Sequence, residues 1–105
     1  MSKKNEFRKE SGRCELCLRD EVQTTEHHLT PKEKGGTFLG TANLCIPCHK
    51  QIHALFTNAE LAAGLHTLEA LRANEAIAGF LRWIRKQPPS VLPRINKSQH
   101  VRGRR

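Results

Sequence analysis

Four cysteines and four histidines between residues 14 and 53 have the types and spacing of metal ligands. The cysteines form two C-x-x-C pairs, which are Cys14 with Cys17 and Cys45 with Cys48. The interleaved histidines are His27, His28, His49 and His53. Because four thiolates complete a closed tetrahedral zinc site, the cysteines account for one ion and the histidines need another explanation.

The two cysteine pairs predict a structural zinc site. Paired C-x-x-C spacing is typical of zinc knuckles in a reducing compartment, whereas disulfides are found mainly in secreted chains. The segment that carries both pairs is so small that its apolar core is marginal, and a bound metal would stabilise its fold. The alternative interpretation is that the four cysteines stay reduced and hold no metal.

The histidines predict a second, open metal site. His49 and His53 are four residues apart where helical spacing is expected, so their rings would lie on one helix face. With His27 from a preceding strand, they would offer three neutral imidazoles to a divalent ion and leave coordination positions free. His28 would point away from His27 and could act as a general base, because histidine titrates near neutral pH. The alternative is that all four are ordinary strand and helix residues.

Two strands, a loop and a helix should position these ligands. Residues 22–27, rich in threonine and valine, and the short run 42–45 favour strands that pair as a hairpin. Residues 32–40 contain three glycines and favour a loop between the strands. Pro47 suits the first turn of a helix that continues over residues 48–56, where apolar residues recur at helical spacing.

Two further helices should follow. Thr57 and Glu60 have the spacing of a capping box and predict a short helix that ends near Gly64. Asn74 is a good N-cap, and apolar residues at i, i+3, i+4 and i+7 predict an amphipathic helix over 75–86. A pair of prolines would end that helix.

We expect one small α+β domain between two tails. Residues 1–12 are polar and have no hydrophobic period, so they predict a flexible N-terminal tail. Residues 13–86 would form the single domain, with the ligand-bearing core over 13–56 and a helical extension over 57–86. Residues 87–105 contain three prolines and no acidic residue, and they predict a flexible basic tail.

The charge of the chain favours a polyanionic partner. Its 105 residues include 18 Lys and Arg against 10 Asp and Glu, which gives a net charge of +8. Nucleic acid is the commonest partner of such proteins. Candidate phosphate contacts are Arg13, Lys32, Lys34, Lys50, Arg94 and Lys97. The sequence has no apolar stretch long enough to span a membrane and no signal peptide, so we expect a soluble cytoplasmic protein without a membrane partner.

The ligand pattern resembles that of a nuclease family. Residues 26–31 read Glu-His-His-Leu-Thr-Pro, two glycines follow at 35 and 36, and residues 44–49 read Leu-Cys-Ile-Pro-Cys-His. With the flanking cysteine knuckles, this combination resembles the HNH endonucleases, also called ββα-metal or His-Me finger nucleases. The His-His and His-x-x-x-His parts are similar to those of the colicin DNases. The resemblance covers residues 13–56.

The resemblance implies an α+β fold in which a ββα-metal (HNH) motif is stapled by a four-cysteine zinc site and followed by C-terminal α-helices. It implies that His28 is the general base. It also implies that His27, His49 and His53 hold a catalytic divalent ion, which could be Mg²⁺, Mn²⁺, Ni²⁺, Co²⁺ or Zn²⁺.

The implied activity is hydrolysis of phosphodiesters in double-stranded DNA. Such an enzyme would nick with low sequence specificity and leave 5′-phosphate and 3′-hydroxyl ends. It would be a cytoplasmic protein of a bacterium or phage. A single site of this kind needs a homodimer or successive nicks to cut both strands, and the sequence leaves the oligomeric state open.

One position departs from the family pattern. Where zinc-bearing members have the middle asparagine, this chain has Gly40, and the nearest asparagine is Asn43. Asn43 is expected on the wrong face of its strand to orient His28. Thr41 or a backbone carbonyl could take the place of that side chain.

Two other functions are open. A zinc-finger DNA-binding or adaptor protein without catalysis would use only the cysteines as ligands. An accessory subunit of a larger DNA-processing machine would become active only with its partner.

Overall fold

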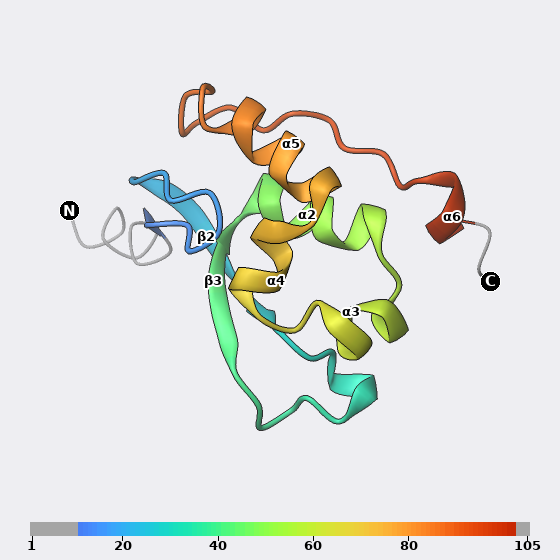
Figure 1. Cartoon of the computed structure of the whole chain (residues 1–105). Helices are drawn as coiled ribbons and strands as arrows, with labels where there is room; N and C mark the ends of the chain where they lie inside the picture. The colour runs from blue at the N-terminus through green and yellow to red at the C-terminus, as the bar shows by residue number, and fades with distance from the viewer. Residues whose placement is uncertain (1–10, 103–105) are drawn as a thin grey trace.

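A three-stranded antiparallel sheet forms one side of the molecule, with strand order β1-β2-β3 (Figure 1). The computed structural model describes residues 11–102. Its strands are β1 (Ser11–Gly12), β2 (Val22–His28) and β3 (Thr41–Cys45). In the β2–β3 hairpin, His27 lies opposite Ala42 and His28 lies opposite Thr41. Because cross-strand partners share a face of the sheet, this register decides which histidine faces the core.

The strands confirm the predicted hairpin and extend it. β2 continues to His28 and β3 begins at Thr41, each one residue beyond the predicted bounds. β1 pairs with the start of β2, so Ser11 and Gly12 belong to the sheet and not to the predicted N-terminal tail. Residues 1–10 of that tail lie outside the described residues. Strand pairing uses backbone groups, which is why a polar composition did not reveal it.

The predicted loop between β2 and β3 contains a short 3-10 helix, η1 (Lys32–Lys34). Gly35 follows it with φ of 88°, a backbone conformation that favours glycine. A side chain at Gly36 would collide with the backbone carbonyl of Thr30. The two glycines therefore allow the loop to fold back on itself before β3 begins.

Helix α2 (Ile46–Leu55) begins directly after β3 and carries two of the predicted ligands. It starts two residues earlier than predicted, because Cys45 has extended geometry at the N-cap and Pro47 fits the first turn. The Phe56 N–H donates to the Ile52 carbonyl and closes the last turn. The helix contacts both β2 and β3, so its inner face is held against the hairpin.

Three short helices follow, namely α3 (Asn58–Gly64), α4 (Leu68–Ala73) and α5 (Glu75–Ile84). The predicted capping box is present, since the Glu60 N–H donates to the Thr57 hydroxyl and the Thr57 N–H donates to the Glu60 carboxylate. Asn74 caps α5 through its side-chain oxygen, as predicted. The sequence predicts no separate helix at α4, where Thr67 provides the cap.

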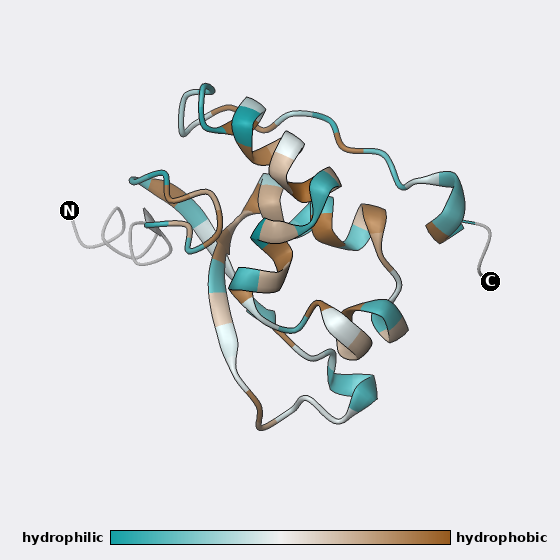
Figure 2. Ribbon diagram, in the orientation of Figure 1, coloured by the Kyte–Doolittle hydropathy of each residue, from teal (hydrophilic) through white to brown (hydrophobic). Residues whose placement is uncertain are grey.

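The hydrophobic core lies between the sheet and the helices and includes all four cysteines. Its largest fully buried apolar side chains are Leu16, Leu44, Ile52, Leu61, Leu71, Ile77 and Ile84. Apolar stretches occur in both the sheet and the helices (Figure 2). Since β3 and the four helices α2 to α5 all contribute, the later helices share one core with the hairpin. Within residues 11–102, no helix is long and apolar enough to cross a bilayer.

The segment after α5 lies in the range 87–105, for which the sequence predicts a flexible basic tail. It turns back and leads to α6 (Gln99–Arg102), which contacts α2 (Figure 1). The Ser98 N–H donates to the Ala54 carbonyl at 2.8 Å. That carbonyl lies in the last turn of α2, where the helix itself offers no partner. These contacts attach the described part of the segment to α2, and its flexibility stays a prediction. Residues 103–105 lie outside the described part.

Candidate functional site

The four cysteines converge where the sheet meets the first helix. Cys14 and Cys17 lie in the turn after β1, Cys45 ends β3, and Cys48 lies in the first turn of α2. All four are buried, and none of them forms a disulfide. Their sulfur atoms lie within 4.8 Å of one another, and the Cys17 and Cys45 sulfurs are 3.9 Å apart. The predicted grouping is confirmed, because four thiols this close can hold one metal ion such as zinc.

Arg19 supports negative charge on these sulfurs. Its guanidinium donates to Cys17 Sγ at 3.4 Å and to Cys45 Sγ at 3.5 Å. The pKa of Cys17 is lowered, first by its hydrogen bond with Cys14 and then by the other two thiols and Arg19. The pKa values of Cys45 and Cys48 are raised, first by their hydrogen bonds with Cys14. The hydrogen bond with Cys17 raises the pKa of Cys14, but those with Cys45 and Cys48 outweigh it and lower this pKa to about 6. Two thiols thus ionise at the expense of the other two, and a bound cation is needed before all four ionise together.

The same guanidinium ties the cysteine site to the chain just beyond α5. Arg19 Nη1 donates to the carbonyls of Gln87 and Pro88, each at 3.0 Å. From the other side, Arg85 Nε donates to the Cys17 carbonyl at 3.0 Å. The turn that carries Cys17 and the start of the C-terminal segment are therefore fixed to each other.

His27, His49 and His53 form a second cluster between β2 and α2. The ring centroids are 5.0 Å apart for His27 and His49, 5.3 Å for His27 and His53, and 5.1 Å for His49 and His53. One ring nitrogen from each lies within 4.8 Å of the others, so the three can hold one metal ion. The structure brings together the three histidines that the spacing predicted as ligands.

His27 offers a ring nitrogen that the protein does not satisfy. Its side chain is 1% exposed, and Nε2 is buried without a hydrogen-bond partner among residues 11–102. Burial, and then the charges of neighbouring histidines, lower the pKa of His27 to about 4. The pKa values of His49 and His53 are also lowered, mainly by burial. A buried neutral imidazole without a partner is costly, and a metal ion fits this set of donors.

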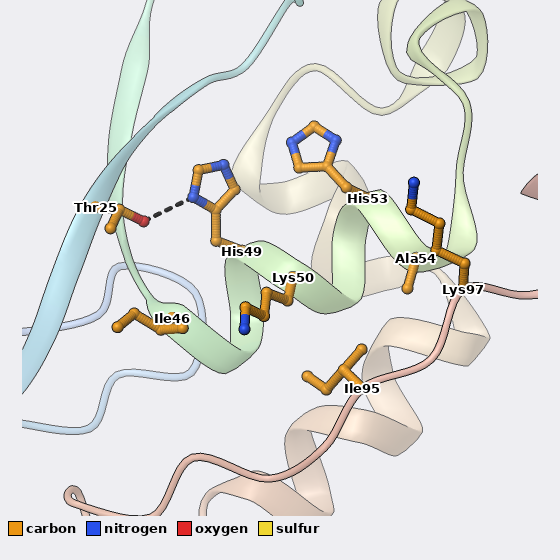
Figure 3. Close-up of a pocket in the computed structure, with 8 residues that line it drawn as sticks. All are labelled: Thr25, Ile46, His49, Lys50, His53, Ala54, Ile95 and Lys97. Carbon is orange, nitrogen blue, oxygen red and sulfur yellow. Dashed lines mark hydrogen bonds between the residues drawn. The ribbon is translucent and has the colours of Figure 1, made fainter.

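Thr25 fixes the ring of His49. Its hydroxyl oxygen lies 2.6 Å from His49 Nδ1 (Figure 3) and donates to the Leu44 carbonyl at 3.5 Å. The tautomer of His49 sets the direction of this contact, and with a metal on Nε2 the Nδ1–H donates to the Thr25 hydroxyl. His49 Nε2 then keeps its lone pair for a metal, as in a ligand histidine whose other nitrogen forms an outer hydrogen bond.

His28 lies beside the histidine cluster but does not belong to it. It is the last residue of β2 and is partly exposed. Its cross-strand partner is Thr41, and the two share the face opposite to that of His27. This placement agrees with the expectation that the two neighbouring histidines point apart. The role of His28 as a base stays a prediction.

The register corrects the expectation for Asn43. Asn43 pairs with Glu26, which lies two residues before His28 on β2. The side chains of Asn43 and His28 therefore lie on the same face of the sheet, whereas the sequence predicted different faces. Its N–H donates to the Glu15 carboxylate at 2.7 Å, and its carbonyl accepts the Glu15 N–H at 2.9 Å. The Gly40 carbonyl accepts the Leu29 N–H at 3.1 Å and closes the loop. At Gly40, where HNH endonucleases have the middle asparagine, a backbone carbonyl holds the loop in this chain.

A pocket of about 470 Å³ opens beside the two helical histidines (Figure 3). It is lined by Thr25, Ile46, His49, Lys50, His53, Ala54, Ile95 and Lys97. The lining includes two lysines and no carboxylate. Ile95 and Lys97 come from the segment after α5, so that segment forms one wall of the pocket.

The predicted phosphate contacts fall into two groups. Three of them line this pocket or the neighbouring one that also includes His53, namely Lys34, Lys50 and Lys97. The other three are exposed and line neither pocket, namely Arg13, Lys32 and Arg94. Arg13 lies 3.9 Å from Asp20, a weak surface pair that partly offsets its charge.

Thr25 and Arg19 are absent from the sequence-based prediction of the site. Thr25 lies two residues before His27 on one strand, and this period-two spacing is the signal that could have identified it. Arg19 contacts sulfurs and carbonyls from distant parts of the chain. No local spacing reveals a residue of that kind.

Comparison with known proteins identifies a bacterial relative. The chain is 64% identical over 88 residues to the uncharacterized protein YisB of Bacillus subtilis (strain 168). The aligned region covers 84% of this chain and 88% of that relative. No family model and no solved structure matches the chain. On this identity and coverage, the chain belongs to the same protein family as YisB of Bacillus subtilis.

Proposed function

We propose that this protein is a metal-dependent DNA endonuclease that nicks phosphodiester bonds with little sequence preference. The observation that carries the proposal is the convergence of His27, His49 and His53, with a buried His27 nitrogen left without a partner among residues 11–102. The resemblance of residues 13–56 to HNH endonucleases supports the same function. The net charge of +8 favours a polyanionic substrate.

His28 is the proposed general base. It adjoins His27, is partly exposed and lies outside the ligand group, so its ring is accessible and is not needed to hold the metal. In the proposed step His28 takes a proton from water as the water oxygen attacks phosphorus. The bond between phosphorus and the 3′ oxygen breaks, and the leaving oxygen takes up a proton from solvent water. The products are a 5′-phosphate and a 3′-hydroxyl.

The three clustered histidines are the proposed ligands of the catalytic ion. Thr25 orients His49, and burial keeps His27 neutral at pH 7. A divalent ion bound there would supply charge that stabilises the oxygens of the reacting phosphate. Imidazole ligands favour zinc, nickel or cobalt, whereas cellular abundance favours magnesium.

The cysteine cluster has a structural role in this proposal. A site with four thiolates has no open position and does no chemistry. It joins the turn after β1 to the end of β3 and the start of α2. The zinc would thereby hold the hairpin and the helix that together carry the histidines.

Plasmid nicking across a panel of divalent ions tests the proposal. The full-length protein is expected to convert supercoiled plasmid to open circles with at least one of magnesium, manganese, cobalt or nickel. His49→Ala should lose this activity, and His66→Ala, at an exposed histidine outside the cluster, is the matched control. Absence of nicking with every ion would overturn the proposal and favour a non-catalytic zinc-finger protein. Nicking that appears only with an added partner would favour an accessory subunit.

A further inference from the structure

We infer that Lys97 binds a phosphate group of the nucleic acid at the histidine site, which makes the segment after α5 part of the substrate site. The inference rests on the proposed function and adds a substrate contact to it. A basic tail would bind DNA anywhere along its length, whereas Lys97 occupies a defined place beside the proposed reaction site.

The segment that carries Lys97 is attached to the molecule at both ends. At its start, Arg19 donates to two successive carbonyls just beyond α5. At its end, the Ser98 N–H donates to the Ala54 carbonyl in the last turn of α2 at 2.8 Å. Because Ser98 is the next residue in the chain, the backbone of Lys97 is held next to the turn that carries His53.

A contact further along the chain supports this attachment. His100 Nε2 lies 3.0 Å from both carboxylate oxygens of Glu60. The pKa of Glu60 is lowered, first by the backbone hydrogen bond from Thr57 and then by His100, so the carboxylate is charged at neutral pH. The pair is exposed and its own energy is small, but it adds a third point at which the segment is held.

Lys97 and His53 line the same two pockets. The Lys97 side chain extends toward His53 (Figure 3). Among residues 11–102, no carboxylate oxygen lies within 4 Å of the Lys97 ammonium.

The positive charges around the pocket favour the binding of an anion. A lysine ammonium beside a site for a divalent cation is repelled unless a negative group lies between them. Lys50 adds a second positive charge to a lining without a carboxylate, and Glu33 lines the neighbouring pocket together with Lys34. A phosphate group has several oxygens and can contact an ammonium with one of them while another faces the histidines. The phosphodiester of a nucleic acid is the ligand of this class that agrees with the proposed function.

Substitution of Lys97 tests the inference through DNA binding, independently of cleavage. Lys97→Met keeps most of the length of the side chain without its charge, and Lys97→Arg keeps the charge. Lys86→Met makes the same change at an exposed position at the end of α5 and is the matched control. Binding of a short fluorescent DNA duplex to the full-length protein is measured by anisotropy over a range of salt, without added catalytic ion.

Lys97→Met is expected to weaken binding about tenfold and to reduce the slope of log K against log salt by about 1. Lys97→Arg should retain most of the affinity, and Lys86→Met should stay close to the wild type. Wild-type affinity and salt slope in Lys97→Met would overturn the inference. Cobalt binding at the histidines is measured separately for both variants. If both lose DNA binding and cobalt binding together, the inference is also overturned, because Lys97 would then act by maintaining the fold.

The nicking assay separates this inference from the proposed function. If the protein never nicks but its DNA binding depends on Lys97 as described, the phosphate contact stands and only the catalytic assignment is rejected. If the protein nicks but Lys97→Met binds DNA like the wild type, the endonuclease assignment stands and only the phosphate contact of Lys97 is rejected.

Discussion

The hydroxyl oxygen of Thr25 lies 2.6 Å from Nδ1 of His49, so this contact occupies Nδ1 and leaves Nε2 as the nitrogen that can bind a metal. The hydroxyl comes from β2 and the ring from α2, so the packing of the strand against the helix orients the ring. Outer hydrogen bonds of this kind change metal affinity by about 10- to 100-fold.

Thr25→Val should therefore weaken cobalt binding at the histidine site by about tenfold or more. Valine has nearly the same shape as threonine but cannot form a hydrogen bond with Nδ1, so the ring would lose its fixed orientation. Cobalt is titrated by calorimetry into protein whose cysteine site already holds zinc. Thr37→Val, at an exposed loop threonine, is the control and should not change the affinity. Equal affinities for both variants would show that the hydroxyl does not orient the ring.

Cobalt binding should persist at mildly acidic pH. A histidine binds metal only when neutral, and burial lowers the pKa of His27 to about 4 and also lowers the pKa values of His49 and His53. Protons should therefore compete weakly near pH 6.5, the ordinary pKa of histidine, and more strongly as the pH falls toward 4. Calorimetric titration of cobalt at several pH values measures this. Loss of most of the affinity already at pH 6.5 would mean that the rings are solvated and not buried.

The same pKa shift predicts how the protein without a metal at the histidines responds to acid. Because the folded-state pKa of His27 lies below the unfolded value, the unfolded chain binds its proton first as the pH falls. The stability contributed by neutral His27 is fully present above about pH 6.5 and is lost as the pH falls toward 4. Between about pH 6.5 and 4, the free energy of unfolding should fall by about 3 kcal/mol less in His27→Gln than in the wild type. Urea unfolding of both proteins at the two pH values measures the difference, and parallel losses would contradict it.

Arg19→Met should loosen the cysteine site and the segment after α5 together. The guanidinium donates to two sulfurs and to two carbonyls, and all four contacts are lost at once. Zinc should pass to a chelator about tenfold faster, and limited proteolysis should cut more readily within residues 89–98. Arg82→Met removes an exposed arginine from α5 and is the control. If zinc loss and proteolysis match the wild type, the two regions are held by other contacts.

The metal-ligand groups could be predicted because each follows from local geometry. A C-x-x-C turn brings two sulfurs together, and the i, i+4 spacing of His49 and His53 brings two rings to one helix face. The cross-strand register that places His27 opposite Ala42 needs the folded hairpin. For that reason the sequence-based prediction placed Asn43 on the wrong face of its strand, although both strands were predicted.

The C-terminal segment could not be predicted for a different physical reason. Its prolines and basic residues predict mobility, and Pro88 has no N–H to donate. Its carbonyl still accepts from Arg19, and the Ser98 N–H finds a free acceptor at the end of α2. These contacts join backbone groups to residues far away in the chain, and neither composition nor spacing encodes them.

The nicking rate of His28→Ala, measured on supercoiled plasmid with the most effective ion, tests the central claim most directly. His28 lies outside both ligand groups, so the variant should keep wild-type contents of zinc and cobalt. Its nicking rate should fall by about 100-fold or more, because a general base contributes about 10²- to 10⁴-fold. A His28→Ala protein that holds both metals and nicks at the wild-type rate would contradict the account.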